Sequence, residues 1–458
     1  MASLSRRNLV GSLGALSAVV ASARPRRAKA AGQTVTVWWN QGFYQAENQA
    51  VQDSVAAWEK MSGNKVDLTF LPVGDVTAKI VSAITIGDVP DLVYSDTGQN
   101  LIVPQASWND KLVDVTDVVD TQRAQFLQTA LESSHFYNNV LKKRSYYGVP
   151  VKSATEMIEV WRPMLEEVGY KDADIPKTWD KYYAFFETVQ DKLRAKGKRI
   201  YGLGYSMATK EADSGNLFHA FLVALGGDGI VSLDGKLHAD DPKVRQAAIK
   251  ALDDLTRPYK KGYVPAGAIN WGDVDNNNAF YAKQIVMTPN TTISIAVAQI
   301  DKHDQYYKEI ITQGIPGDNA GNPVPSLLSV PLCFIPKGAK NVDGAKDFLK
   351  YFIQPDKLNN YLKQARGRWV PVMPASVKND PFWTDPADPH CPVAVRQALV
   401  TPTVSWFQIR NPAYADVNAK QIWMAAEANI TQKGWTAEKA ADDALDQIKT
   451  IFEKYTIT

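Results

Sequence analysis

Near the start of the chain, the spacing of hydrophobic residues alternates between the two-residue period of a strand and the 3.6-residue period of a helix. Residues 34–38 alternate apolar with polar side chains, as a half-buried strand does, and residues 51–58 repeat apolar side chains at helical spacing. A second strand and helix are predicted at 66–70 and 76–84, followed by a third strand at 90–94. The order β-α-β-α-β predicts a parallel sheet covered by helices. Glycines at 63 and 87 are the expected helix ends.

Polar and aromatic side chains follow two of these predicted strands. Parallel α/β sheets bind ligands beyond the carboxyl ends of their strands, so these residues are candidate ligand contacts. They are Trp38, Trp39, Asn40, Gln41, Ser95 and Asp96. Alternation requires one of the two adjacent tryptophans to pack in the core, and Asp96 has an alternative role as a turn cap.

A second α/β region is predicted between residues 157 and 292. Strands are expected at 157–161, 200–205 and 285–287, and a long helix is expected after Thr178 as its cap. Candidate ligand contacts in this region again follow strands or precede helices. They are Tyr205, Trp271, Asp273, Asn290 and Thr291.

The hexapeptide Tyr147–Lys152 lies between the two regions. Gly148 permits backbone angles that other residues avoid, and Pro150 favours an extended Val149. We therefore expect a hinge at Gly148, Val149 and Pro150, where the chain passes from one lobe to the other. An apolar strand at 327–335 would return to the first lobe, so at least two crossings are expected. Helices are predicted beyond it, ending with one capped by Thr436.

The first thirty residues have the features of an export signal. Ser5-Arg6-Arg7-Asn8-Leu9-Val10 is a twin-arginine pattern, followed by a short apolar run and by Ala28-Lys29-Ala30. An ordinary secretory signal is the alternative. No cysteine follows the apolar run, which favours a freely diffusing periplasmic protein over a lipoprotein.

The charge balance and length describe an exported protein with a large core. At 458 residues the chain is long enough for two or three domains. The segment 1–30 carries six basic residues and no acid, so its removal changes the net charge from +2 to −4. A mildly acidic mature protein argues against a nucleic-acid partner.

Motifs for catalysis or metal binding are weak. The five histidines are isolated, no phosphate-binding loop is present, and no cofactor or metal is expected. Asp273, Asp275 and Asn277 resemble the start of a calcium loop but lack its glycine and its final glutamate. Cys333 and Cys391 are expected either as a disulfide or as two buried thiols.

Several short motifs in a fixed order resemble the extracellular solute-binding proteins of family 1, the periplasmic components of ABC importers, which mostly bind sugars. The motifs span almost the whole mature chain and include Gly87–Val93, Tyr147–Pro150, Pro176–Trp179, Ala345–Phe352 and Gly367–Pro371. The chain departs from the pattern of this family at two places: Trp161-Arg162 stands where many members have Tyr-Asn, and Gln284 stands where many have glycine.

The resemblance implies an α/β, two-lobe periplasmic binding protein fold of type II with C-terminal helices. The first lobe would comprise 33–149 and 326–375, the second 150–325, and a helical segment 376–458 would brace the lobes and hinge. Arg368 and Trp369 in the returning segment join the candidate contacts. Arg368 would either pair an anionic group of the solute or form a salt bridge at its turn.

The implied function is capture of a small carbohydrate or related polar solute between the lobes of a monomer. The protein would deliver it to the permease and ATPase subunits of an ABC importer, without catalysis. Two alternatives remain: a periplasmic hydrolase acting on a carbohydrate, and a receptor-coupled solute sensor.

Overall fold

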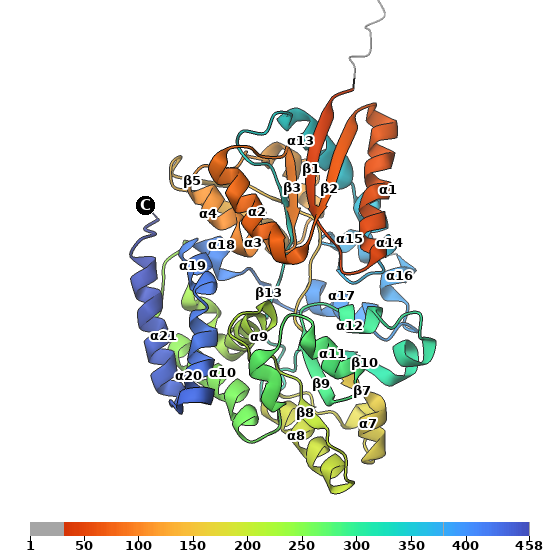
Figure 1. Ribbon diagram of the computed structural model, residues 1–458, viewed down its shortest axis with the longest axis vertical. Helices are drawn as coiled ribbons and strands as arrows, with labels where there is room; N and C mark the ends of the chain where they lie inside the picture. The colour runs from red at the N-terminus through yellow and green to blue at the C-terminus, as the bar shows by residue number, and fades with distance from the viewer. Residues whose placement is uncertain (1–31, 379, 458) are drawn as a thin grey trace, which may run out of the picture.

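Two separate sheets organise the protein into two lobes (Figure 1). The computed structural model describes residues 32–378 and 380–457. The predicted signal segment, 1–30, lies outside the described residues. The mixed α/β architecture with helices at the C-terminus is the fold class expected from the sequence.

The first lobe is built on a five-stranded sheet in the order β2-β1-β3-β12-β6. Its strands are β1 (Thr34–Asn40), β2 (Lys65–Leu71), β3 (Leu92–Ser95), β6 (Val149–Pro150) and β12 (Leu332–Phe334). The first three are parallel, as predicted, whereas β12 runs antiparallel to both β3 and β6.

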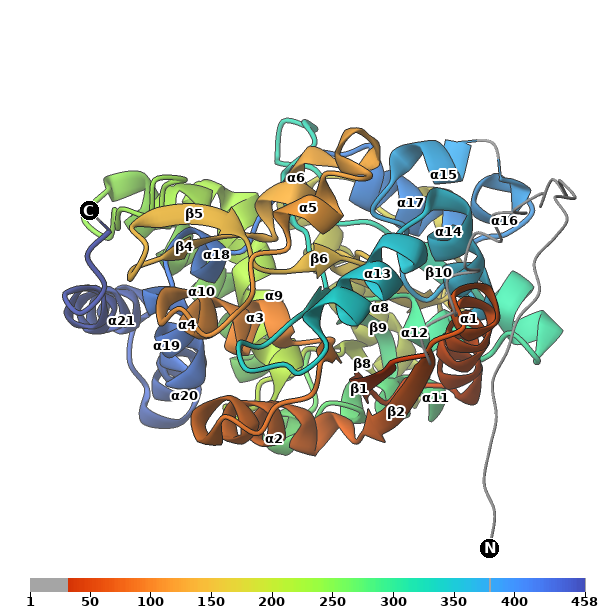
Figure 2. The same ribbon diagram turned by 90° about the horizontal axis from the view of Figure 1, so that it is seen from above.

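The helices of the first lobe end where glycine permits. Helix α1 (Gln45–Ser62) ends at Gly63 and α2 (Val73–Ile86) ends at Gly87, and both glycines have left-handed backbone angles, with φ of 76° and 87°. Helix α14 (Pro355–Gln364) packs on α1, and α13 (Val342–Phe352) packs on β1 (Figure 2). The smaller elements that follow β3 are α3 (Gly98–Leu101), α4 (Val103–Trp108), α5 (Thr116–Val119), α6 (Gln128–Glu132), β4 (His135–Asn138) and β5 (Lys143–Tyr146).

The second lobe is built on a four-stranded sheet in the order β10-β7-β9-β8. Its strands are β7 (Met157–Trp161), β8 (Tyr201–Leu203), β9 (Ile285–Asn290) and β10 (Ile310–Gln313). Its helices are α7 (Arg162–Glu167), α8 (Trp179–Ala195), α9 (Ala212–Leu222), α10 (Pro242–Lys260), α11 (Asp275–Tyr281) and α12 (Ser294–Val297). Thr178 occupies the cap position of α8, but its side chain makes no capping hydrogen bond.

Three chain segments pass between the two sheets. The runs 151–156 and 328–331 connect strands of different sheets, and the run 365–373 follows α14. Bridges between Ser153 and Val370 and between Ala154 and Ser329 hold the three side by side. The apolar strand expected at 327–335 is divided by one of these crossings into β11 (Ser326–Leu327) and β12.

The residues expected to form the hinge, Gly148, Val149 and Pro150, lie directly before the crossing at 151–156. Val149 and Pro150 form β6 inside the first sheet, and Gly148 packs so closely that an added Cβ would lie 2.7 Å from Leu332 Cδ1. The glycine is required by this contact, since its φ is not left-handed. The run 151–156, which follows β6 and precedes β7, belongs to neither of the two sheets.

The C-terminal segment contacts elements of both lobes. Helices α20 (Ile422–Lys433) and α21 (Ala437–Phe452) pack against α10 of the second lobe. Helix α19 (Ala413–Ala419) packs on α3 and α18 (Phe407–Arg410) on β4, next to the first lobe. Thr436 caps α21 by accepting a hydrogen bond from Lys439 N, as predicted. The other elements here are α15 (Pro374–Lys378), α16 (Pro381–Thr384), α17 (Cys391–Leu399) and β13 (Thr403–Val404).

Cys333 and Cys391 are both buried free thiols, so the disulfide alternative is excluded. Within residues 32–378 and 380–457, no helix has the length and apolar character needed to span a membrane.

Candidate functional site

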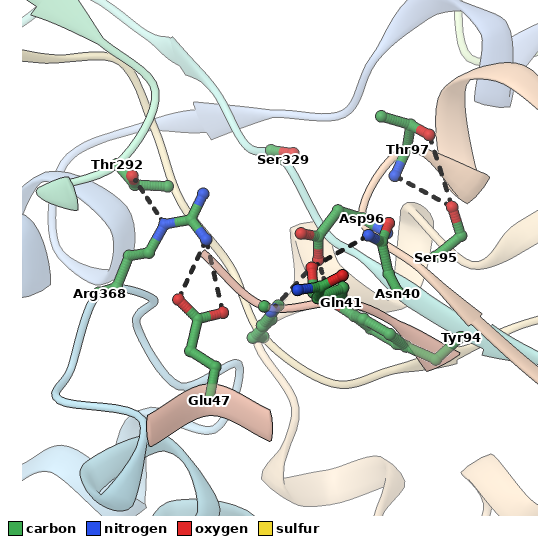
Figure 3. A network of polar contacts seen from close by, with 12 residues as sticks. Asn40, Gln41, Glu47, Tyr94, Ser95, Asp96, Thr97, Thr292, Ser329 and Arg368 are labelled. Carbon is green, nitrogen blue, oxygen red and sulfur yellow. Dashed lines mark hydrogen bonds and ion pairs between the residues drawn. The ribbon is translucent and has the colours of Figure 1, made fainter. Parts of the chain in front are cut away.

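The carboxyl ends of β1 and β3 meet at the edge of the first lobe that faces the second. Asn40, the last residue of β1, accepts a hydrogen bond from Asp96 N through its Oδ1 at 3.2 Å (Figure 3). The Tyr94 hydroxyl donates to the Asp96 carboxylate. The strand-end residues predicted from the sequence are thus brought together, and each fixes the position of the next.

Lys152, in the first crossing, supplies the positive charge for Asp96. Its ammonium lies 3.3 Å from Asp96 Oδ1 and over the Trp369 ring, 4.4 Å from the centroid, while only 2% of its side chain is exposed. Burial favours the neutral form of Asp96, but the charges of Lys152 and Arg368 outweigh it and lower the pKa of the carboxyl. This pair joins the first crossing to the strand-end residues of the first lobe.

Arg368 forms a second buried ion pair at the same edge. Its Nη1 lies 3.1 Å from Glu47 Oε1, and its Nε donates to Thr292 Oγ1 at 3.4 Å (Figure 3). Burial alone would lower the pKa of the guanidinium, but Glu47 and Asp96 outweigh that effect and raise it. Of the two roles expected for Arg368, the structure contains the salt bridge.

A cavity of about 290 Å³ lies between the lobes and the C-terminal segment. We call it the interlobe cavity. The first lobe contributes Thr97 and Asn100, the second contributes Asn216 and Asp273, and the C-terminal segment contributes Trp406 and Gln421. Its size suits a small polar molecule, and its walls come from three parts of the chain that are far apart in sequence.

An aromatic surface forms the C-terminal side of this cavity. Trp406 is buried, its ring centroid lies 5.4 Å from that of His219, and both side chains line the cavity. Trp406 Nε1 has no hydrogen-bond partner in the described protein, although an indole N–H is normally satisfied when buried.

His219 is held neutral by its surroundings. Its Nδ1 lies 2.6 Å from the Gly215 carbonyl, which can only accept, so Nδ1 carries the proton. Its Nε2 then accepts from the Tyr414 hydroxyl at 3.2 Å. Burial lowers the pKa of His219 to about 4, so the ring adds no positive charge to the cavity at neutral pH.

The second-lobe wall of the cavity carries carboxyl groups. Glu211 caps α9, accepting from Ser214 N and Asp213 N at 2.6 Å each, and its Oε1 also accepts from the Ser206 hydroxyl. Burial raises the pKa of Glu211, and burial together with Glu211 and Asp273 raises the pKa of Asp213 to about 8. Asp273 Oδ1 accepts from Ala212 N at 3.0 Å.

The remaining candidates of the first lobe lie at or behind this edge. Trp39 is buried and stacks on Tyr94 with centroids 4.2 Å apart, so it is the core tryptophan that alternation required. Trp38 is partly exposed under Lys79, Gln41 is exposed, and Ser95 is fully buried. Trp369 is buried beneath Lys152 and Arg368.

The second-lobe candidates are more dispersed. Tyr205 is buried among Tyr183 and Phe221, with no open ring face, and Trp271 packs partly buried against the core. Asn290 holds its own turn through Thr292 O and Ser294 Oγ, while Thr291 donates to Glu156 in the first crossing. Of these candidates only Asp273 lines the interlobe cavity.

The calcium-loop resemblance has a structural explanation. Asp273 and Asp275 accept backbone N–H groups of Ala212 and Gly272, which fixes the turn before α11. Across the described part of the chain, no group of three or more histidine, cysteine, aspartate or glutamate residues is arranged to hold a metal ion.

Sequence reasoning missed several residues of the cavity, including Thr97, Glu211, His219 and Trp406. Thr97 was within reach, because it follows Asp96 at the same strand end. Trp406 lies in an irregular segment far from either predicted sheet, and no periodic pattern shows that this segment folds back onto the cleft.

The chain belongs to the bacterial extracellular solute-binding protein family, whose model matches residues 53–390. Solved structures share the fold at low identity. An ABC transporter solute-binding protein of Thermotoga lettingae TMO, bound with alpha-D-tagatose, has a TM-score of 0.73 at 20% identity, covering 92% of this chain and 100% of that one. Maltose-bound MalE3 of T. maritima has a TM-score of 0.71 at 19% identity, with 92% and 100% covered.

A third similar structure is a sugar transporter protein of Arthrobacter chlorophenolicus A6 with bound laminaribiose. Its TM-score is 0.70 at 14% identity, with 91% of this chain and 99% of that one covered. Among curated proteins, none matches this sequence. The family is one of extracellular solute-binding proteins, and each of these three structures holds a bound sugar.

Proposed function

We propose that this protein captures a small carbohydrate between its lobes and delivers it to the permease and ATPase subunits of an ABC importer. The observation that carries the proposal is the interlobe cavity, to which both lobes and the C-terminal segment contribute side chains. A solute in this position contacts all three parts only when the lobes are closed. Binding then shifts the open–closed equilibrium toward the closed form.

The cavity offers the two kinds of contact that a sugar needs. Trp406 provides an apolar ring, and Thr97, Asn216 and Gln421 provide groups for hydroxyls. Asn40, Asp96 and Arg368 shape the adjoining floor of the cleft. We keep Trp38 and Gln41, which lie at the same strand end, as proposed contacts in a more open form.

The same proposal covers export and assembly. Residues 1–30 act as a twin-arginine signal, the mature protein diffuses freely in the periplasm, and it works as a monomer. We propose the lobe limits expected from the sequence, except that Pro150 belongs to the first lobe through β6 and that 151–156 acts as the hinge.

A thermal-shift screen tests the proposal. The sugars named for the similar structures, tagatose, maltose and laminaribiose, together with acarbose, form the first panel. A true ligand at a hundred times its Kd stabilises the protein by about 2.7 kcal/mol and raises its Tm accordingly. No shift with any sugar, or turnover of any of them, would contradict capture without catalysis.

A matched pair of variants locates the binding. Trp406→Ala should abolish calorimetric binding of the sugar that gives the shift. Trp435→Ala removes a tryptophan from the same C-terminal segment that does not line the cavity, and should leave binding unchanged. Equal affinity in both variants would place the solute elsewhere.

A further inference from the structure

Three amide side chains link the first lobe to the C-terminal segment at the wall of the interlobe cavity. Gln408 of α18 is fully buried, and its Nε2 donates a hydrogen bond to Asn100 Oδ1 in α3. Its Oε1 accepts from Asn418 Nδ2 in α19 at 3.3 Å. Asn100 and Asn418 line the cavity and are partly exposed, whereas Gln408 does not line it. We call these three side chains the amide triad.

The position of Gln408 is fixed by its burial. Helices α18 and α19 both pack on α3, so the amide triad lies inside a packed junction (Figure 1). Two residues further along, Arg410 Nη1 donates to Val231 O at 2.7 Å and anchors the end of α18. Because water does not reach Gln408 and a buried amide is normally hydrogen-bonded, the two asparagines are its required partners.

The amide triad determines which atoms the cavity receives. An amide nitrogen only donates and an amide oxygen only accepts, so Gln408 holds Asn100 by its oxygen and Asn418 by its nitrogen. The remaining atoms, Asn100 Nδ2 and Asn418 Oδ1, make no hydrogen bond to the described part of the chain. Turning the Gln408 amide by 180° would exchange the two roles. In either orientation the cavity receives one donor and one acceptor.

We propose that Gln408 is a positioning residue for the solute, and that the amide triad favours a neutral polyol over a charged solute. Asn100 Nδ2 donates to one hydroxyl of the solute, and Asn418 Oδ1 accepts from another. A hydroxyl can take either role, whereas a carboxylate only accepts and an ammonium only donates. The inference rests on the proposed function, because it assumes that the interlobe cavity holds the solute.

Gln408→Glu tests the positioning role with almost no change in side-chain size. The introduced carboxylate can only accept, so it attracts both asparagine nitrogens and turns both asparagine oxygens to the cavity. When protonated, the carboxyl has one donor and one acceptor, as the native amide has. Whichever of tagatose, maltose and laminaribiose binds the native protein should bind the variant about tenfold more weakly at high pH and recover as pH falls. Calorimetry from pH 5 to pH 9 measures this.

The result is expressed as the ratio of variant to native affinity at each pH. Four other titratable residues line the cavity, and the ratio cancels their titration: Lys210, Glu211, His219 and Asp273. Gln190→Glu is the control, because Gln190 is an equally buried glutamine of α8 that does not line the cavity, and its ratio should stay at one. For Gln408→Glu, a ratio of one at every pH overturns the inference. A lowered ratio that does not change with pH also overturns it, since that loss would come from packing.

Asn100→Asp gives a second measurement at a site that is partly exposed and tolerates a charge. The variant keeps the oxygen that accepts from Gln408 and replaces the donor Nδ2 with a second oxygen. We expect the same sugar to bind about tenfold more weakly. Asn109→Asp is the matched control, because Asn109 is exposed at the end of α4 in the same lobe and does not line the cavity. Unchanged affinity in Asn100→Asp overturns the inference.

The outcomes also separate this inference from the function on which it rests. If a sugar binds and Trp406→Ala abolishes that binding, while Gln408→Glu and Asn100→Asp bind as the native protein does, the cavity is a sugar site and only the positioning role is wrong. If no sugar binds the native protein, both proposals fail.

Discussion

The two lobes stabilise their buried ionisable groups in different ways. In the first lobe and its crossings, Glu47 is 3% exposed and Lys152 is 2% exposed, and each has a partner of opposite charge. In the second lobe, Glu159 is fully buried and Glu211 nearly so, and neither forms an ion pair with a lysine or arginine of the described residues. Their pKa values are raised instead, because burial favours the protonated acid.

Because of this difference, the stability of the two lobes should respond differently to substitution and to pH. Paired charges keep their interaction over a wide pH range but fail together when one partner is removed. A buried acid that stays protonated needs no charged partner. Its ionisation as pH rises lowers the stability of the fold unless a cation compensates the new charge. Substitution should therefore affect the first lobe most, and pH should affect the second.

The largest effect is expected from Lys152→Met. The change leaves Asp96 without its closest cation at the lobe junction, and breaking a buried pair costs about 3 kcal/mol or more. We expect the low end, because Arg368 also acts on Asp96 and the aspartate is partly exposed. Denaturant unfolding at pH 7 measures the loss.

The double variant Lys152→Met/Asp96→Asn is the control for this prediction. It removes both charges, so it should recover part of the stability that the single variant loses. If Asp96→Asn lowers the free energy of unfolding of the Lys152→Met variant by as much as it lowers that of the native protein, the two residues are not coupled.

The second prediction concerns Glu159 in β7. His390 Nε2 faces the Tyr306 carbonyl at 2.8 Å and must donate to it, so His390 Nδ1 accepts from the Thr312 hydroxyl at 2.6 Å. That hydroxyl has no second hydrogen for Glu159 Oε2, which is also 2.6 Å away. The hydrogen bond is complete only if the Glu159 carboxyl is protonated and donates.

Burial raises the pKa of Glu159 from 4.5 to about 8, in agreement with this hydrogen-bond pattern. The unfolded chain releases the proton at about 4.5 and the folded protein keeps it to about 8, so stability falls as pH rises through this window. The maximum slope from one such group is about 1.4 kcal/mol per pH unit.

Glu159→Gln removes this titration while its amide can still donate to Thr312. We expect the variant to gain about 2–3 kcal/mol relative to the native protein between pH 5.5 and 7.5. Unfolding free energies measured across that range give the slope. Glu438→Gln, an exposed change on α21, should leave the slope as it is. Parallel curves for the native protein and Glu159→Gln would show that Glu159 is ionised in the folded state.

The sequence predicts the helices and strands of both lobes better than it predicts the contacts between residues that are far apart in the chain. The strands of the first sheet, the glycines that end α1 and α2, and the cap of α21 follow from local chemistry that neighbouring residues carry. The Glu47–Arg368 pair does not, because its members are 321 positions apart and each has many possible partners. Strand alternation required one core tryptophan but could not choose Trp39 over Trp38.

The cavity was harder to predict for the same physical reason. Its first-lobe side follows from strand ends, whereas its C-terminal side depends on how an irregular segment folds back across two lobes. Tyr205 shows the opposite error: it follows a predicted strand, yet the aromatic core of the second lobe encloses it. Position after a strand identifies a region for binding more securely than a residue.

The smallest effect is expected where the two lobes meet directly. The Tyr44 hydroxyl, just before α1, donates to the carbonyl of Ser294 in α12 at 2.7 Å. Tyr44→Phe should remove about 1 kcal/mol from the closed form and so favour opening about fivefold. Small-angle scattering of the ligand-free protein should then report a larger radius of gyration. Tyr281→Phe is the matched control, since that hydroxyl donates to the neighbouring Ile295 carbonyl from within the second lobe. It should cost similar stability without opening the cleft, and identical scattering from Tyr44→Phe and the native protein would mean that this contact does not hold the lobes together.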